Sequence, residues 1–194
     1  MNAFIRTAAL LACAGVVQVA QAAAPSATSL TPGFSFQAYT GAAPVGEGSV
    51  DTRDTLFFID EQAAAGLKSW YIFFDPKGPQ IVDAVLTFDR PIVDVFTTRA
   101  QLDGSNATYG IDVDGDSVMN DYGTHRFIGL EPSQVPFGDS ITWTAGSNTV
   151  HLRFDALDPG DHVRVLVAVP EPSSHALLAA GLGLLAYLAA RRRR

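Results

Sequence analysis

The sequence predicts an all-β fold built as a single β-sandwich, for which a jelly-roll-like arrangement is one option. From Phe34 onward, short segments rich in β-branched and aromatic residues are separated by Gly-, Pro- and Asp-rich turns every 8–15 residues. Several segments alternate apolar and polar residues, as in Thr149–Phe154, so that one face packs on a core and the other meets water. This combination is typical of two packed sheets.

The chain of 194 residues divides by composition into four parts. We expect a signal peptide (1–22), a linker rich in small residues (23–33), the β-sandwich domain (34–169) and a C-terminal sorting segment (170–194). One short helix is predicted in the domain, at Glu61–Lys68. The predicted strands are Phe34–Tyr39, Thr55–Ile59, Ser69–Phe74, Ile81–Phe88, Ile92–Thr97, Thr108–Val113, Thr124–Ile128, Ser140–Thr144, Thr149–Phe154 and His162–Val169.

The N-terminal segment has the three parts of a secretory signal peptide. Arg6 gives the positive start, Ala8–Val17 is apolar, and the small residues Ala20 and Ala22 flank Gln21 at a predicted cleavage site. We therefore expect export through the Sec translocon. An alternative is a lipobox at Leu10–Cys13, with Cys13 lipidated. Cys13 is the only cysteine, so a chain cleaved at Ala22 has no thiol for a disulfide.

The predicted domain is strongly acidic. Between Ala23 and Val169 there are eight basic and nineteen acidic side chains, a formal charge of −11. Such a surface repels phosphate groups, which argues against a nucleic-acid partner. The same acidity is compatible with binding of a cation.

The C-terminal segment combines a rigid motif, an apolar run and a basic end. Pro170-Glu171-Pro172 cannot continue a strand or helix. Residues 174–190 are predicted as a transmembrane helix, in which the uncharged run 176–190 is about 22 Å long. The chain then ends in Arg191, Arg192, Arg193 and Arg194, which the positive-inside rule keeps in the cytoplasm.

This order of parts resembles the PEP-CTERM sorting domain of Gram-negative bacteria. The resemblance implies that an exosortase, a membrane-embedded cysteine transpeptidase, recognises Pro170, Glu171 and Pro172. The helix would then be a transient inner-membrane anchor and the arginines a basic stop. The protein would pass to the cell surface or to an extracellular polysaccharide matrix. The stretches FFDPKG, LTFDRPIVDV and DALDPGDHVRVLVAVPEP are also similar to PEP-CTERM cargo proteins of no assigned activity.

One acidic loop has the composition of a Ca²⁺ site. Oxygen-bearing side chains alternate along it, in part with the spacing of an EF-hand loop, although Gly123 stands where the last acidic ligand would be. An alternative is a solvated acidic hairpin. The candidate ligands are Asp112, Asp114, Asp116, Asn120 and Asp121.

The sequence favours a non-enzymatic protein with no catalytic residue and no cofactor other than an optional Ca²⁺. One alternative is a Ca²⁺-assisted carbohydrate-binding module that uses outward aromatic residues of Phe57–Phe58 or Trp70–Phe74 to bind exopolysaccharide. We expect most of these aromatics to pack in the core or to cover a second layer. The other alternative is a secreted hydrolase, although no serine stands in a Gly-x-Ser-x-Gly motif.

Overall fold

The computed structural model describes most of the chain between residues 22 and 169. The described residues are 22–113, 115, 122–123, 128–131, 138–169, 181–183 and 191. They belong to two compact units: residues 22–169 form the domain, and residues 1–21 with 170–194 form the other unit. Three predicted features lie outside the described residues. They are the signal peptide before Ala22 (with Ala20 of the cleavage site), the motif Pro170–Pro172 and the arginines Arg192–Arg194.

The predicted transmembrane helix at 174–190 is described only at residues 181–183, which are helical. Across the described residues, no helix has both the length and the apolar character that crossing a membrane requires.

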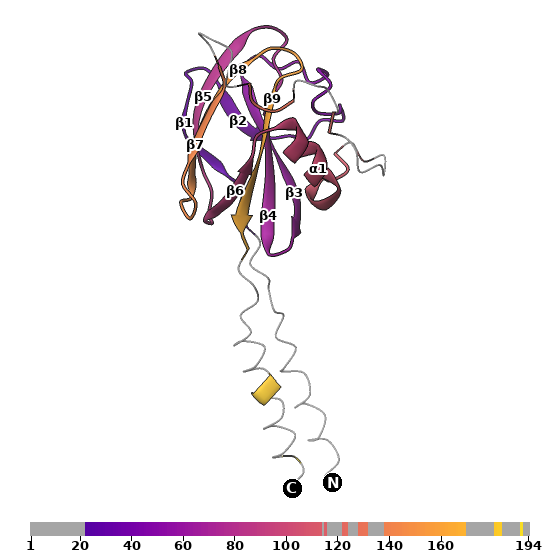
Figure 1. Cartoon of the computed structure of the whole chain (residues 1–194), viewed down its shortest axis with the longest axis vertical. Coiled ribbons are helices and arrows are strands. Elements are labelled where there is room, and N and C mark those ends of the chain that lie inside the picture. The colour runs from indigo at the N-terminus through magenta and orange to yellow at the C-terminus, as the bar shows by residue number, and fades with distance from the viewer. Residues whose placement is uncertain are drawn as a thin grey trace, which may run out of the picture. The chain divides into compact units, whose positions relative to one another are not determined.

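Nine strands and one helix make up the described part of the domain (Figure 1). A four-stranded sheet has the order β1-β5-β8-β7, and a five-stranded sheet has the order β2-β3-β4-β9-β6. The described residues are thus mostly strand, which confirms the predicted all-β class. The elements are β1 (Ser26–Leu30), β2 (Ser35–Ala38), β3 (Thr55–Ala64), β4 (Leu67–Phe74), β5 (Gln80–Thr87), β6 (Ile92–Phe96), α1 (Arg99–Tyr109), β7 (Ser140–Trp143), β8 (Thr149–Ala156) and β9 (Asp161–Ala168).

Most neighbouring strands pair antiparallel. The pair β2 and β3 is parallel, with Phe36 opposite Leu56. A jelly roll is wholly antiparallel, so this pair departs from the jelly-roll option.

The main core lies between the two sheets. Val150, Leu152 and Phe154 of β8 face it and are at most 3% exposed, whereas His151 of the same strand is exposed. Inward residues of β3, β4, β5, β6 and β9 complete this apolar cluster. The two sheets therefore pack face to face around one shared layer, as the alternation in β8 predicted.

A second apolar cluster covers the outer face of the five-stranded sheet. Tyr71 and Phe73 of β4 point away from the main core and are buried with Leu102 of α1 and Tyr122. Because β4 is buried on both faces, the run Trp70–Phe74 is apolar throughout. Both clusters consist of residues within 22–169, so the domain has complete cores of its own.

Helix α1 includes part of the segment Thr108–Val113, for which a strand was predicted. Thr98 caps the helix, because its side chain accepts the Gln101 N–H while the Gln101 side chain accepts the Thr98 N–H. This capping box is readable in the sequence as Thr-Arg-Ala-Gln. The prediction failed because Leu102 and Tyr109 are the only large apolar residues that the helix buries.

The segment Glu61–Lys68, predicted as a helix, is instead the end of β3, a tight turn and the start of β4. The turn residues Ala65 and Gly66 both have positive φ, 51° and 76°. Two such residues form the hairpin turn that matches the twist of the flanking strands. Tertiary contacts override the helix propensity of the Ala-rich run, because Glu61 is paired to a buried arginine of β9.

Two further predictions need correction. The predicted linker 23–33 contains β1, which pairs with β5 and is therefore part of the four-stranded sheet. Its small polar residues fit an edge strand, since only part of each side chain must be buried. Of the predicted strand Thr124–Ile128, only Ile128 is described, and it is not in a strand.

Arg164 of β9 and its partner Glu61 of β3 are both fully buried. The guanidinium Nε and Nη2 atoms donate to the two carboxylate oxygens of Glu61 at 2.7 Å. Nη1 donates to the carbonyl oxygen of Leu102 at 3.0 Å, and Nη2 also donates to Asn106 Oδ1 at 2.9 Å. This bidentate pair therefore links two strands of the five-stranded sheet to α1.

We expect Arg164→Met to lower the free energy of unfolding of the domain (residues 22–169) by about 3–5 kcal/mol, because it leaves the Glu61 carboxylate buried and unpaired. The double variant Glu61→Leu/Arg164→Met should lose less than the two single variants combined. Urea denaturation measures both. Arg153→Gln is the matched control, because its ion pair with Asp83 is exposed and should contribute less than about 1 kcal/mol. Additive losses would contradict the predicted coupling.

Candidate functional site

The two ends of the domain lie at one turn. The Ala23 N–H donates to Asp89 Oδ2 at 2.8 Å, and the Ala168 N–H donates to the Pro91 carbonyl oxygen at 3.0 Å. Asp89 and Pro91 are two residues apart, so the chain enters and leaves the domain at the same place. The Val169 N–H donates to the Gly66 carbonyl oxygen at 2.9 Å, so backbone hydrogen bonds hold the chain up to the residue before Pro170.

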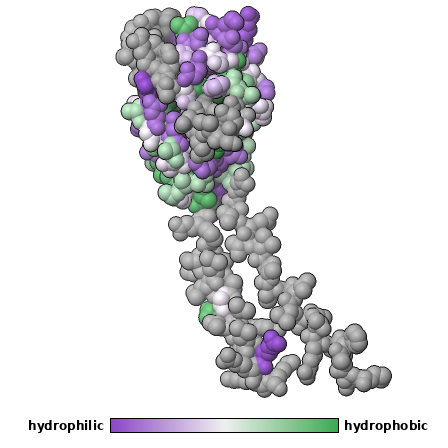
Figure 2. Space-filling view, turned by 90° about the vertical axis from the view of Figure 1, so that its right-hand side faces the viewer, coloured by the Kyte–Doolittle hydropathy of each residue, from purple (hydrophilic) through white to green (hydrophobic). Residues whose placement is uncertain are grey.

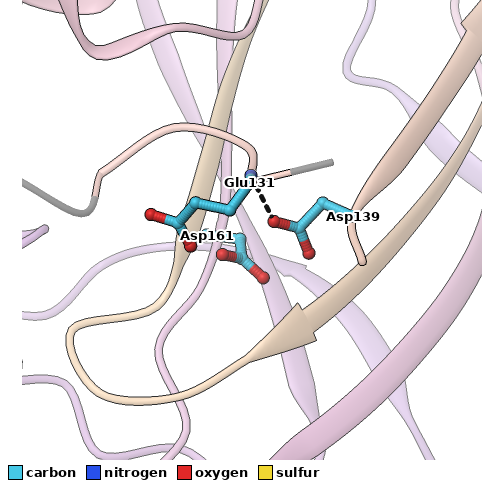
Figure 3. Close-up of side chains that lie close together, drawn as sticks. All are labelled: Glu131, Asp139 and Asp161. Atoms are coloured by element: carbon cyan, nitrogen blue, oxygen red, sulfur yellow. Dashed lines mark hydrogen bonds between the residues drawn. The ribbon is translucent and has the colours of Figure 1, made fainter. Parts of the chain in front are cut away.

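Three carboxylates from separate parts of the chain meet in the domain; we call Glu131, Asp139 and Asp161 the carboxylate cluster. One oxygen of each lies within 4.8 Å of the others. Figure 3 shows the three side chains close together. Asp139 immediately precedes β7 of the four-stranded sheet, and Asp161 begins β9 of the five-stranded sheet. The cluster therefore contacts both sheets.

Local backbone structure fixes these side chains. Asp139 accepts the Glu131 N–H at 2.7 Å through Oδ2 and the Asp155 N–H at 2.8 Å through Oδ1. Asp161 follows Gly160, whose φ is +87° and whose Cα faces the Phe74 carbonyl so closely that a Cβ would collide with it. Only glycine fits there, and it turns the chain so that Asp161 enters β9 beside the cluster.

The cluster brings three ionisable carboxyl groups together in a poorly hydrated place. Asp161 is 3% exposed and Asp139 is 5% exposed. Asp161 Oδ2 has no hydrogen-bond partner among the described residues. Burial is the main cause that raises the pKa of Asp161 to about 9; the charge of Asp139 and a side-chain hydrogen bond with Asp139 come next, followed by the charges of Glu131 and Asp155. Burial and Asp139 also raise the pKa of Glu131. Such a group can be neutralised by a proton or by a cation.

The predicted Ca²⁺ loop shares no residue with this cluster. Asp112 accepts the Gly115 N–H at 2.6 Å through Oδ1. The other four candidate ligands, Asp114, Asp116, Asn120 and Asp121, lie outside the described residues. The loop prediction is therefore untested.

The outer face of the four-stranded sheet has a shallow depression. It is lined in part by Ser29, Asp83, Thr142, His151 and Arg153. Arg153 Nη1 donates to both oxygens of Asp83, at 3.2 and 3.0 Å. On the face in Figure 2, hydrophilic residues gather at the upper end of the domain and hydrophobic ones occur in small groups.

The aromatic run that suggested sugar stacking is not available at the surface. Trp70 faces the main core, whereas Tyr71 and Phe73 belong to the second apolar cluster, and none of the three is more than 1% exposed. The expectation that these rings cover a second layer is therefore confirmed.

The last strand of the folded β-domain is followed directly by the C-terminal segment. That segment is first Pro-rich, then apolar and then basic. This order is the organisation of a protein with a C-terminal sorting signal. Residues 168–194 match the family described as PEP-CTERM protein-sorting motif, so the chain carries a PEP-CTERM sorting domain, as predicted. The motif implies an exported protein whose sorting depends on an exosortase. No curated protein and no solved structure matches the chain.

Asp75 is another buried carboxyl group, with 0% exposure. Its Oδ2 accepts the Val50 N–H at 3.1 Å, and its Oδ1 has no hydrogen-bond partner among the described residues. Burial raises its pKa to about 6, the Val50 bond opposes this, and Asp158 and Asp51 add to the rise.

Between pH 4 and pH 6, the unfolded chain releases the Asp75 proton while the folded domain retains it. Below pH 4, protonated Asp75 therefore makes its full contribution to the free energy of unfolding. This contribution is lost as the pH rises through 6. We expect Asp75→Asn to gain stability relative to the wild-type domain over this interval, on the order of 2–3 kcal/mol. Urea unfolding at several pH values measures the difference, with the exposed Asp54→Asn as control. A difference that does not change with pH would contradict this assignment.

Proposed function

We propose that the protein is a non-enzymatic surface or extracellular-matrix protein that an exosortase releases from the inner membrane by cutting near Pro170–Pro172. The observation that supports this most strongly is the position of the PEP-CTERM match. It begins at Ala168, the last residue of β9, so the sorting segment continues directly from a central strand of the domain.

The arrangement of the domain ends supports a membrane-side processing step. Because Ala23 and Ala168 are both hydrogen-bonded to the turn Asp89–Pro91, the first and the last residues of the domain lie at one edge of it. Cleavage after Ala22 would leave the new Ala23 ammonium group beside the Asp89 carboxylate, where the two charges attract. The mature N-terminus would then remain folded onto the domain.

The length of the connecting segment limits where cleavage can occur. About six residues separate Val169 from the predicted helix, which is about 20 Å when extended. A domain that is hydrogen-bonded up to Val169 cannot supply more chain without unfolding β9. The motif is therefore presented within a short distance of the bilayer surface, where a membrane-embedded enzyme can reach it.

Replacing Pro170, Glu171 and Pro172 together by alanine in the full chain, expressed in its native host, should block this processing. We expect the triple variant to keep Arg191–Arg194 and to stay in the inner-membrane fraction. The wild-type protein should reach the surface without the arginines. Cell fractionation and mass spectrometry of the intact protein distinguish the two forms. Ser173→Ala/Ser174→Ala is the matched control, since it changes adjacent residues but leaves the motif intact. Normal processing of the triple variant would rule out recognition through Pro170–Pro172.

The non-enzymatic role has its own test. The mature surface form should show no turnover in a broad screen of glycosidase, esterase and peptidase substrates. Turnover that copurifies with the protein and is lost when the domain is unfolded would favour the hydrolase alternative.

A further inference from the structure

We propose that Glu131, Asp139 and Asp161 bind one divalent cation of the oxygen-preferring kind, Ca²⁺, at the junction of the two sheets. This site is distinct from the acidic loop 112–121 and does not depend on the sorting function.

The spacing of the three carboxylates fits one Ca²⁺ ion. Their nearest oxygens lie within 4.8 Å of one another. Ca²⁺ binds oxygen at 2.3–2.6 Å, so oxygens on opposite sides of the ion are up to about 5 Å apart, which accommodates this spacing. A single Ca²⁺ can therefore contact all three groups without a large movement. Because Glu131 is only partly buried, water can supply further ligands.

The strongest indication of a ligand is the buried oxygen of Asp161. The residue is 3% exposed, and its Oδ2 has no hydrogen-bond partner among the described residues, although it lies beside two other acidic side chains. A buried polar atom without a hydrogen-bond partner lowers the stability of the fold unless a bound group interacts with it. In the described ranges, no lysine, arginine or histidine forms an ion pair with any member of the carboxylate cluster.

Asp139 is held as a ligand that is already oriented. Both of its oxygens accept backbone N–H groups, from Glu131 and Asp155. Each carboxylate oxygen has two lone pairs, so one on each atom remains for a metal ion. These hydrogen bonds fix the orientation of the carboxylate before an ion arrives, which reduces the entropy lost on binding.

A cation at this position would connect the two layers of the sandwich. Asp139 immediately precedes β7 and Asp161 begins β9, and these strands lie in different sheets. Ca²⁺ that binds the folded domain and not the unfolded chain therefore stabilises the packing of one sheet on the other.

The test uses the domain, residues 22–169, after removal of metal ions with EDTA. Isothermal titration should show one Ca²⁺ per chain, with a dissociation constant in the range of about 0.1–1 mM that is typical of extracellular modules. At 10 mM CaCl₂ the melting temperature should rise by about 3–10 °C, and MgCl₂ should have a smaller effect. Absence of saturable Ca²⁺ binding to the wild-type domain would overturn the proposal.

Two variants assign the site. Asp161→Asn and Glu131→Gln should each weaken Ca²⁺ binding at least tenfold and remove most of the thermal shift. Circular dichroism in EDTA verifies that each variant is folded. Glu131 is only partly buried, so Glu131→Gln carries the test if Asp161→Asn does not fold.

Two matched controls change an acidic residue elsewhere. Asp83→Asn removes an exposed carboxylate on the outer face of the four-stranded sheet, and Asp112→Asn removes the first residue of the predicted Ca²⁺ loop. Both should bind Ca²⁺ like the wild-type domain. Loss of binding in Asp112→Asn, with binding retained in both cluster variants, would place the ion in the loop and overturn the assignment to the carboxylate cluster.

Discussion

The ion pair between Arg164 and Glu61 is the interaction on which the architecture of the five-stranded sheet depends. A central strand that is covered on both faces normally carries apolar residues on both, and β9 places a guanidinium in the covered outer face. The buried guanidinium of Arg164 is stable there because Glu61 accepts hydrogen bonds from two of its nitrogen atoms and α1 supplies further acceptors. The charge thereby fixes where α1 packs, since a helix without those acceptors would leave Nη1 unsatisfied. The guanidinium also lies over the rings of Tyr71 and Tyr122, at 5.1 and 5.5 Å, so the second apolar cluster is built around it.

Strand β9 links the features that concern function. It begins with Asp161 in the carboxylate cluster, carries Arg164 in its covered outer face, and ends one residue before Val169. Its pairing with β4 extends over all eight residues without a bulge. Because every residue of β9 is paired, local unfolding of its C-terminal end is costly in free energy. The strand therefore resists force or proteolysis that acts on the C-terminal tail. This is a physical reason for a sorting segment to follow a central strand rather than an edge strand.

The sequence was informative where the structural signal is local. Alternation in Thr149–Phe154 correctly assigned β8 and its inward residues, and the order of motif, apolar run and arginines identified the sorting segment. Prediction failed where distant residues decide the outcome. Glu61–Lys68 has a helix-forming composition, yet its place between β3 and β4 is set by a partner 103 positions along the chain. Ser26–Leu30 forms a strand because it pairs with the open edge of β5. No pattern within the segment itself predicts this strand.

The carboxylate cluster shows the same limit for a site. Its members are separated by 8 and 22 positions, with a strand pair between Asp139 and Asp161, so no spacing rule for a compact metal loop would find them. The one local clue is the sequence Asp158-Pro159-Gly160 before Asp161, which indicates a turn at the start of a strand and does not indicate a ligand. Asp161 and Val169 are eight residues apart on an extended strand, about 26 Å. Asp161 and Val169 therefore lie at opposite ends of β9, too far apart for direct electrostatic contact at physiological ionic strength. A cation at the cluster would act on the stability of the sandwich, while recognition of the tail would depend on the residues that follow Val169.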